Sequence, residues 1–195
     1  MDDHRLIAPL AEFHGEVPPA PAWFHKAVEQ APERVMVDSD GAGIETLIWG
    51  RRGAPGLLFM HGNSAHADWW SFLAPFFAEE WRVVAFSFSG MGGSERRDHY
   101  SLDAFTREAF ATAEAAGLFE ADRKPVFVGH SLGAMVTAAA AADAGERLSC
   151  AVFADPPFRS PEVKQALTSS AASSHPRSSG QPASSPFNPA TNASG

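Results

Sequence analysis

The chain has 195 residues, of which 45% are hydrophobic and 19% charged, and its formal net charge is −8. This length and composition predict one soluble globular domain, and the acidic charge argues against a nucleic-acid partner. Cys150 is the single cysteine, which excludes an intramolecular disulfide and fits a reducing compartment. The acidic N-terminus lacks the apolar stretch of a signal peptide, and no run approaches the roughly 18 apolar residues of a membrane span. We therefore expect a cytoplasmic protein that acts on a small molecule, with no nucleic acid and no membrane as partner.

The first third of the chain predicts an extension followed by a hairpin. Residues 1–32 are interpreted as an N-terminal extension, with a stiff, proline-rich segment at 18–21. Residues 22–30 are expected to form a short helix that packs on the main domain. Two alternating segments, 34–38 and 44–49, flank a Ser-Asp-Gly turn and predict an antiparallel pair of strands.

From residue 56 onward, short apolar runs alternate with helical segments. The expected strands are 56–60, 82–86, 125–128 and 149–154, and the expected helices are 67–80, 101–116 and 134–142. Ser101 is a suitable N-cap for its helix and Gly117 a suitable end. This alternation indicates an α/β fold with a mostly parallel sheet and helices on both faces. Functional loops of such sheets gather beyond the carboxyl ends of the strands.

The stretch Gly129-His130-Ser131-Leu132-Gly133 lies between a buried strand and an alanine-rich helix. A Gly-x-Ser-x-Gly sequence in this context is the nucleophile-elbow pattern. The sharp turn forces the serine into a strained backbone conformation and pushes its hydroxyl beyond the strand. Neighbouring chain then comes very close, which is why residues without a Cβ flank the turn. A plain turn serine is the alternative interpretation of these five residues.

Several motifs occur in an order that resembles the α/β-hydrolase fold superfamily, of the serine hydrolase or esterase type. They are Phe59-Met60-His61-Gly62-Asn63, Trp69-Trp70, the glycine-rich segment 83–94, the elbow at 129–133, and Ala151-Val152-Phe153-Ala154-Asp155-Pro156. The resemblance covers about residues 33–158, so we assign 33–160 to a partial α/β-hydrolase core. One departure lies at 87–92, where the family often has Asp-x-Arg-Gly-His-Gly and this chain has Ser-Phe-Ser-Gly-Met-Gly.

The resemblance implies a set of site residues for acyl transfer. Ser131 would be the nucleophile, and the backbone N–H groups of Leu132 and Asn63 would form the oxyanion hole. Asp155, after the sixth strand, is a candidate for the acid, although Asp-Pro is also a common strand-end turn. No cofactor is expected. No metal site is expected either, because His61 and His66 lack the carboxylate or cysteine company of a zinc site.

The resemblance also requires a late catalytic histidine, and this residue is hard to find. The only histidine after the elbow is His175, in a serine- and proline-rich segment that we expect to be disordered. His61 is expected to be structural and His130 to point away along the turn, while His66 and His99 are loop residues that could line a pocket.

Two expectations follow for the end of the chain. Residues 161–195 are interpreted as a cap remnant and a disordered tail. We accordingly expect a product truncated after the sixth of the family's eight strands, with that strand as an exposed apolar edge.

Three functions stay open at this point. The first is a serine hydrolase that cleaves a carboxylic ester or a related acyl or C–C bond. The second is an inactive fragment or binding module without the triad histidine. The third is a haloperoxidase-like, lyase or thioesterase variant, since fold does not fix reaction. Epoxide hydrolases and dehalogenases fit less well, because they use a carboxylate nucleophile where this chain has Ser131.

Overall fold

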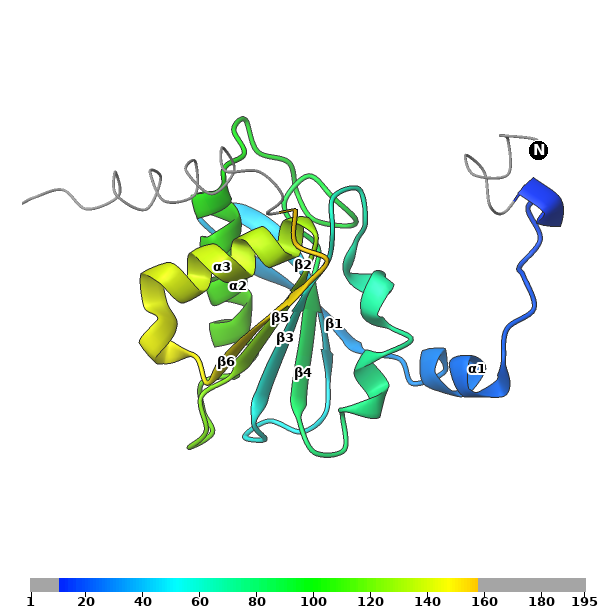
Figure 1. Ribbon diagram of the computed structural model, residues 1–195, viewed down its shortest axis with the longest axis horizontal. Coiled ribbons are helices and arrows are strands. Elements are labelled where there is room, and N and C mark those ends of the chain that lie inside the picture. The colour runs from blue at the N-terminus through cyan, green and yellow to red at the C-terminus, as the bar shows by residue number, and fades with distance from the viewer. Residues whose placement is uncertain (1–10, 158–195) are drawn as a thin grey trace, which may run out of the picture.

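The computed structural model describes residues 11–157, which form a six-stranded sheet of order β1-β2-β4-β3-β5-β6 (Figure 1). The strands are β1 (Glu33–Ser39), β2 (Ala42–Trp49), β3 (Gly56–Met60), β4 (Arg82–Phe86), β5 (Val126–His130) and β6 (Cys150–Ala154). The hairpin β1–β2 is antiparallel and joins β4 antiparallel, whereas β4, β3, β5 and β6 run parallel. The predicted mostly parallel sheet is confirmed.

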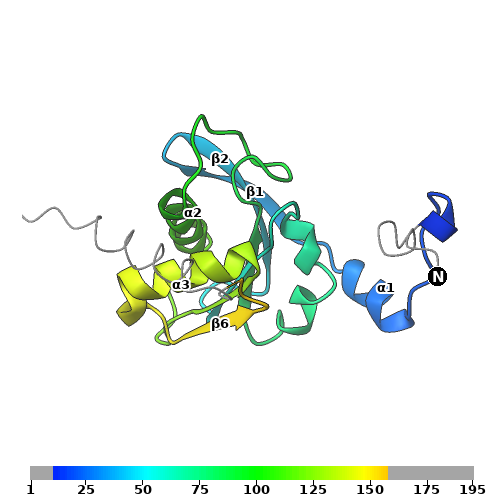
Figure 2. The same cartoon turned by 45° about the horizontal axis from the view of Figure 1, so that its top comes forward.

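Helices cover both faces of this sheet (Figure 2). Helices α2 (Leu102–Ala115) and α3 (Leu132–Ala144) pack on one face over Leu58, Phe86 and Phe127. On the other face, Phe59 and Trp70 belong to a second buried cluster. Figure 2 shows α2 and α3 on one side of the sheet and the short turns after β3 on the other.

The ends of α2 match the sequence prediction. The Ser101 hydroxyl accepts a hydrogen bond from the Ala104 N–H at 3.1 Å, which satisfies one of the free donors of the first turn. Gly117 has φ +80°, the left-handed conformation that commonly ends a helix.

The helix predicted over 67–80 was wrong. The segment instead forms two 3-10 helices, η3 (Ala67–Trp70) and η4 (Ala74–Phe76), separated by turns. Pro75 offers no N–H for an intrahelical bond and disfavours a helical conformation at the residue before it. The apolar side chains of this segment still pack on the sheet, since Trp70 stacks on Phe59 with ring centroids 4.6 Å apart.

The N-terminal helix packs on the main body as expected. A 3-10 turn, η2 (Ala11–Phe13), precedes helix α1 (Ala22–Val28). The Phe24 ring stacks on Phe72 with centroids 6.1 Å apart, and Trp23 lies 6.2 Å from Phe76. No described helix is both long and apolar enough to cross a bilayer.

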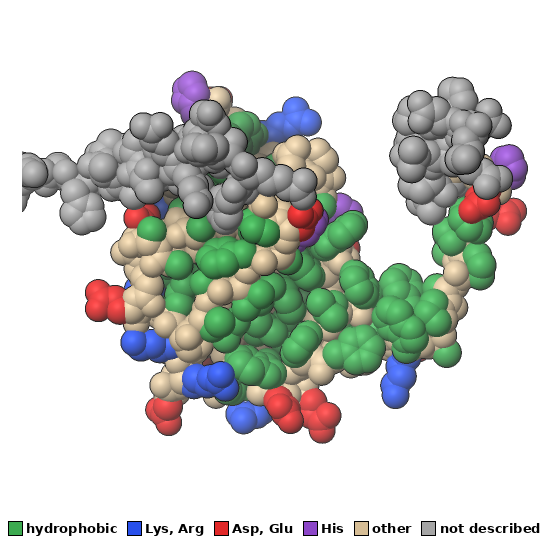
Figure 3. Space-filling model, viewed as in Figure 1, with side chains coloured by type: hydrophobic (Ala, Val, Ile, Leu, Met, Phe, Trp, Pro, Cys, Tyr) green, Lys and Arg blue, Asp and Glu red, His purple; other side chains and the backbone are tan. Residues whose placement is uncertain are grey.

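Strand β6 forms one edge of the sheet, next to β5. Its side chains Val152 and Phe153 are 42% and 43% exposed, which agrees with the apolar edge expected from the sequence. Figure 3 shows hydrophobic side chains gathered over the centre of the face on which Figure 1 places β6 nearest the viewer. The predicted cap remnant and tail, 161–195, and His175 lie outside the described residues, and the domain boundaries stay predictions.

Candidate active site

Ser131 occupies the tip of a sharp turn between β5 and α3. Its backbone has φ 52° and ψ −110°, a conformation that a non-glycine residue adopts only under strain. The two glycines of the motif permit this turn by close approach. A Cβ on Gly129 would lie 2.1 Å from the Gly133 carbonyl oxygen, and a Cβ on Gly133 would lie 2.4 Å from the Met60 carbonyl oxygen. The predicted elbow geometry is therefore present.

Backbone hydrogen bonds from two other strand ends hold this turn. The Ser131 N–H donates to the Ala154 carbonyl of β6 at 3.0 Å, and the Gly133 N–H donates to the His61 carbonyl after β3 at 3.1 Å. The N–H of Leu132, at the first turn of α3, has no acceptor among the described residues. An unpaired N–H at a helix N-terminus is a favourable site for negative charge.

The loop after β3 lies directly against the elbow. A Cβ on Gly62 would be 3.2 Å from the Ser131 Cβ and 2.9 Å from the His130 Nδ1, so a larger residue there would have to displace the His130 ring. The next residue, Asn63, donates its side-chain amide to the Ser64 hydroxyl at 3.2 Å. Its backbone N–H has no acceptor within the described part of the chain. Asn63 and Leu132 line the same pocket, so the fold brings the two predicted oxyanion residues together.

His61 has a structural position, as expected. The Phe88 N–H donates to its Nε2 at 3.1 Å, which leaves the proton on Nδ1, and Nδ1 lies 2.7 Å from the Gly62 carbonyl. Burial lowers the pKa of this imidazole to about 4, so the ring is neutral at physiological pH. His61 thus joins the loop after β3 to the loop after β4, and both of its ring nitrogens are used in these contacts.

None of the other histidines within residues 11–157 forms a hydrogen bond with the Ser131 hydroxyl. His130 stacks on Trp69 with centroids 5.9 Å apart, and its Nδ1 is buried without a hydrogen-bond partner among residues 11–157. The His66 Nδ1 lies 3.6 Å from an Asp68 carboxylate oxygen. Neither His66 nor His99 lines the pocket that Asn63 and Leu132 share.

Asp155 directly follows the carbonyl that accepts the Ser131 N–H. Its backbone has φ 45°, and its side chain is exposed at the carboxyl end of β6. The structure therefore places the candidate acid at the same edge of the sheet as the candidate nucleophile.

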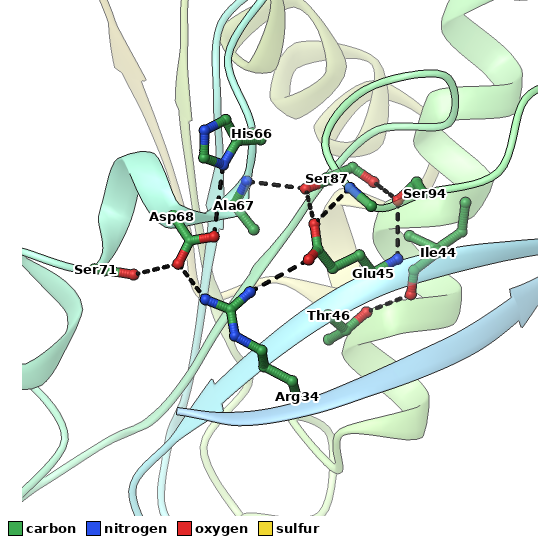
Figure 4. Close-up of polar contacts among 11 residues, drawn as sticks. Arg34, Ile44, Glu45, Thr46, His66, Ala67, Asp68, Ser71, Ser87 and Ser94 are labelled. Atoms are coloured by element: carbon green, nitrogen blue, oxygen red, sulfur yellow. Dashed lines mark hydrogen bonds and ion pairs between the residues drawn. The ribbon is translucent and has the colours of Figure 1, made fainter. Parts of the chain in front are cut away.

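Sequence reasoning missed the carboxylate of Glu45, which fastens the glycine-rich loop after β4 (Figure 4). Its Oε2 accepts hydrogen bonds from the Ser87 hydroxyl at 2.8 Å and the Gly93 N–H at 2.9 Å. The Ser94 hydroxyl accepts the Glu45 N–H and donates to the Ser87 carbonyl at 2.6 Å. Arg34 pairs with Glu45 and with Asp68. Glu45 of the β1–β2 hairpin thus supplies the carboxylate that holds the loop at 87–93, where this chain departs from the family sequence.

A second missed carboxylate, Glu108 of α2, holds the same loop from the other side. It is fully buried, accepts the Ser89 N–H at 3.0 Å, and pairs with Arg97 at 2.8 Å. A glutamate among small and apolar residues of the helix, 11 residues after an arginine, was the only signal available in the sequence. A buried pair of this kind fixes position because either charge alone would be costly.

An open pocket of about 510 Å³ lies between these loops. It is lined by Asn63, Ser89, Gly90, Met91, Arg96, Tyr100, Phe105 and Leu132. A mostly apolar lining with a few polar groups is typical of small-molecule sites.

Comparison with known proteins identifies the family. The family model described as "Alpha/beta hydrolase family" matches residues 57–192, which is more than half of the chain. The chain belongs to the alpha/beta hydrolase family. A non-heme chloroperoxidase of Burkholderia pyrrocinia is 34% identical over 87 residues, covering 44% of this chain and 30% of its own length. A bifunctional esterase/perhydrolase of Acinetobacter calcoaceticus is 36% identical over 100 residues, covering 50% and 35%. The chain thus spans about a third of the length of these curated relatives.

Solved structures of the same family superpose on this α/β-hydrolase core. Epoxide hydrolase A from Mycobacterium thermoresistibile matches with a TM-score of 0.58 and 25% identity, over 63% of this chain and 38% of its own. An N-formylmaleamic acid deformylase from Pseudomonas putida matches with a TM-score of 0.55 and 27% identity, over 64% and 47%. A bacterial membrane phospholipase A matches with a TM-score of 0.61 at 24% identity, over 86% and 53%, which is a likeness of fold.

Proposed function

We propose that this chain is a serine hydrolase that uses the Ser131 hydroxyl to attack a carboxylic ester or a related acyl or C–C bond. The observation that carries the proposal is the strained turn at Ser131, which the close approach of Gly129 and Gly133 makes possible. Strain of this kind persists where the surrounding structure enforces it, and it clusters at functional sites. The esterase/perhydrolase and the deformylase among the similar proteins support this class of reaction.

In this proposal the Ser131 oxygen adds to the substrate carbonyl, and the negative charge develops on the carbonyl oxygen. The unpaired N–H groups of Leu132 and Asn63 would donate to that oxygen, with the N-terminus of α3 adding its positive potential. The serine proton must pass to a base, and Asp155 is the proposed acid that would orient it. His175, the only histidine after the elbow, lies outside the described residues.

A second function is favoured by one specific observation. Among residues 11–157, no histidine hydrogen-bonds the Ser131 hydroxyl: both ring nitrogens of His61 contact backbone groups, and the His130 Nδ1 has no partner. A chain with the pocket and without an activated nucleophile would bind a small molecule and not turn it over.

Labelling with a fluorophosphonate separates the two functions, because this reagent reacts with activated serines. The protein is incubated with the probe, and the modified residue is located by mass spectrometry, alongside hydrolysis of short p-nitrophenyl esters. Ser131→Ala is compared with Ser149→Ala, whose hydroxyl bonds the Pro125 carbonyl beside the start of β5, at the other end of that strand. A hydrolase loses labelling and turnover only in Ser131→Ala. A cooperatively folded wild type that is not labelled and hydrolyses only at background rates would refute the hydrolase.

A further inference from the structure

Arg96 differs from most arginines of the described residues. The others that pair with a carboxylate or lie over an aromatic ring are Arg34, Arg52, Arg82, Arg97, Arg107, Arg147 and Arg123. Arg96 and Arg51 are exposed and have no such partner within residues 11–157. The neighbouring carboxylate of Glu95 is directed elsewhere, since it accepts the Gly43 N–H at 2.7 Å.

The location of Arg96 separates it from Arg51. Arg96 lines the pocket that also contains Asn63 and Leu132, and its side chain has no carboxylate or ring partner within residues 11–157. Arg51 lies in the loop between β2 and β3 and so precedes β3. Asn63 of the pocket follows β3, at the other end of the strand. A guanidinium without a carboxylate partner presents its full set of donors to whatever enters the pocket.

The rest of the pocket suits the middle of an extended molecule. Met91, Phe105 and Leu132 supply apolar surface to the lining of this pocket. The Ser89 hydroxyl is buried and has no hydrogen-bond partner among the described residues, although Ser89 lines this pocket. Buried hydroxyl groups are normally paired, so an oxygen of a bound ligand would satisfy it.

We propose that this pocket selects acyl compounds that carry a carboxylate at the end remote from the reacting carbonyl, and that Arg96 is the residue that recognises that carboxylate. The proposal rests on the function proposed above in that it places the reacting carbonyl at Ser131. Arg96 is a specificity residue in this account, because it touches the substrate away from the bond that breaks. A planar guanidinium binds a carboxylate through two parallel hydrogen bonds, which gives direction as well as charge.

The size of the effect follows from the exposure of Arg96. Ion pairs in contact with solvent are screened, so we expect a preference of about fivefold for the charged compound and not a larger one. The same screening predicts that the preference shrinks as the salt concentration rises toward 1 M.

Two ligands that differ at one terminus test this: monomethyl adipate, which ends in a carboxylate, and dimethyl adipate, which ends there in a neutral methyl ester. Their dissociation constants are measured by amide NMR shifts on full-length Ser131→Ala, so that no turnover interferes. The same measurement is made with Arg96→Gln and, as the matched control, Arg51→Gln in that background. We expect about fivefold tighter binding of the monoester, loss of this preference in Arg96→Gln, and its retention in Arg51→Gln.

Equal affinities for the two esters, or an equal effect of both arginine substitutions, would overturn the assignment of Arg96. This outcome is independent of the proposed hydrolysis, because binding to Ser131→Ala needs no nucleophile. A wild type that is not labelled by the fluorophosphonate would refute the hydrolase, and the binding ratio would still decide the role of Arg96.

Discussion

Gly129→Ala is the most direct test of the elbow. The added Cβ would lie 2.1 Å from the carbonyl oxygen and 2.2 Å from the carbonyl carbon of Gly133, and 2.4 Å from the Thr137 hydroxyl. Two of these atoms are backbone of α3 and cannot rotate away. Overpacking of a tight site costs typically about 1–3 kcal/mol, and we expect about 3 kcal/mol because the contacts are so short. For a domain of this length that loss lowers the melting temperature by roughly 2–4 °C per kcal/mol.

The assay is urea unfolding of Gly129→Ala, with Gly145→Ala as the matched control. Gly145 ends α3 with ordinary helical dihedrals, φ −58° and ψ −30°, and a Cβ there would meet nothing within 4 Å. Replacing that glycine should leave stability unchanged or raise it by about 0.4–1 kcal/mol through the unfolded state. If Gly129→Ala is as stable as wild type, β5 and α3 are not in close contact at this glycine. The close approach of Gly129 and Gly133 would then not explain the strained backbone of Ser131.

Three further predictions concern the residues that brace the site. Glu108→Gln leaves the Arg97 charge without its buried partner and should lower the free energy of unfolding in urea by about 2 kcal/mol. Glu114→Gln removes an exposed ion pair and should lower it by less than about 1 kcal/mol. Equal losses in the two variants would refute a stabilising role for the buried pair. Unfolded His61 binds a proton below about pH 6.5 and the folded residue only near pH 4, so stability should fall by about 3 kcal/mol as the pH drops through this window. That fall should be smaller in His61→Gln, and an unchanged pH profile would contradict the buried neutral ring. Ser101→Ala removes the cap of α2 and should cost about 1 kcal/mol by thermal unfolding, with no change in fluorophosphonate labelling.

Local patterns in the sequence were sufficient for most of the fold. Short apolar runs identified every strand from β3 to β6, and Ser101 and Gly117 bounded α2, because each signal depends on neighbours along the chain. The segment 67–80 failed because its aromatic residues gave a helix-like pattern while Pro75 prevented the hydrogen bonds of a helix.

The site could be predicted only where one segment carries the geometry. The strained turn at Ser131 was predicted because the elbow pattern is local, and its dihedrals are confirmed, whereas the role of Ser131 as nucleophile stays a prediction. Glu45 and Glu108 were not found, because the loop partners of their carboxylates lie 11 to 48 residues away in sequence. Nothing in the strand around Glu45 or the helix around Glu108 reveals which loop it will meet. Pairing across the fold is a property of the assembled sheet.

The contacts of Glu45 and Glu108 explain how this chain holds the loop after β4 without the family's usual sequence at 87–92. The Ser87 hydroxyl donates to the Glu45 carboxylate at 2.8 Å and accepts the Ala67 N–H at 3.0 Å, so it joins the hairpin to the segment after β3. His61 then connects the Phe88 N–H to the loop that carries Asn63, so the anchor at Glu45 extends to the elbow through one neutral ring. Protonation of His61 would replace that acceptor with a second donor facing an N–H. Acid should therefore loosen the Asn63 loop before it unfolds the sheet, and the amide exchange rate of Phe88 is where this would first be measured.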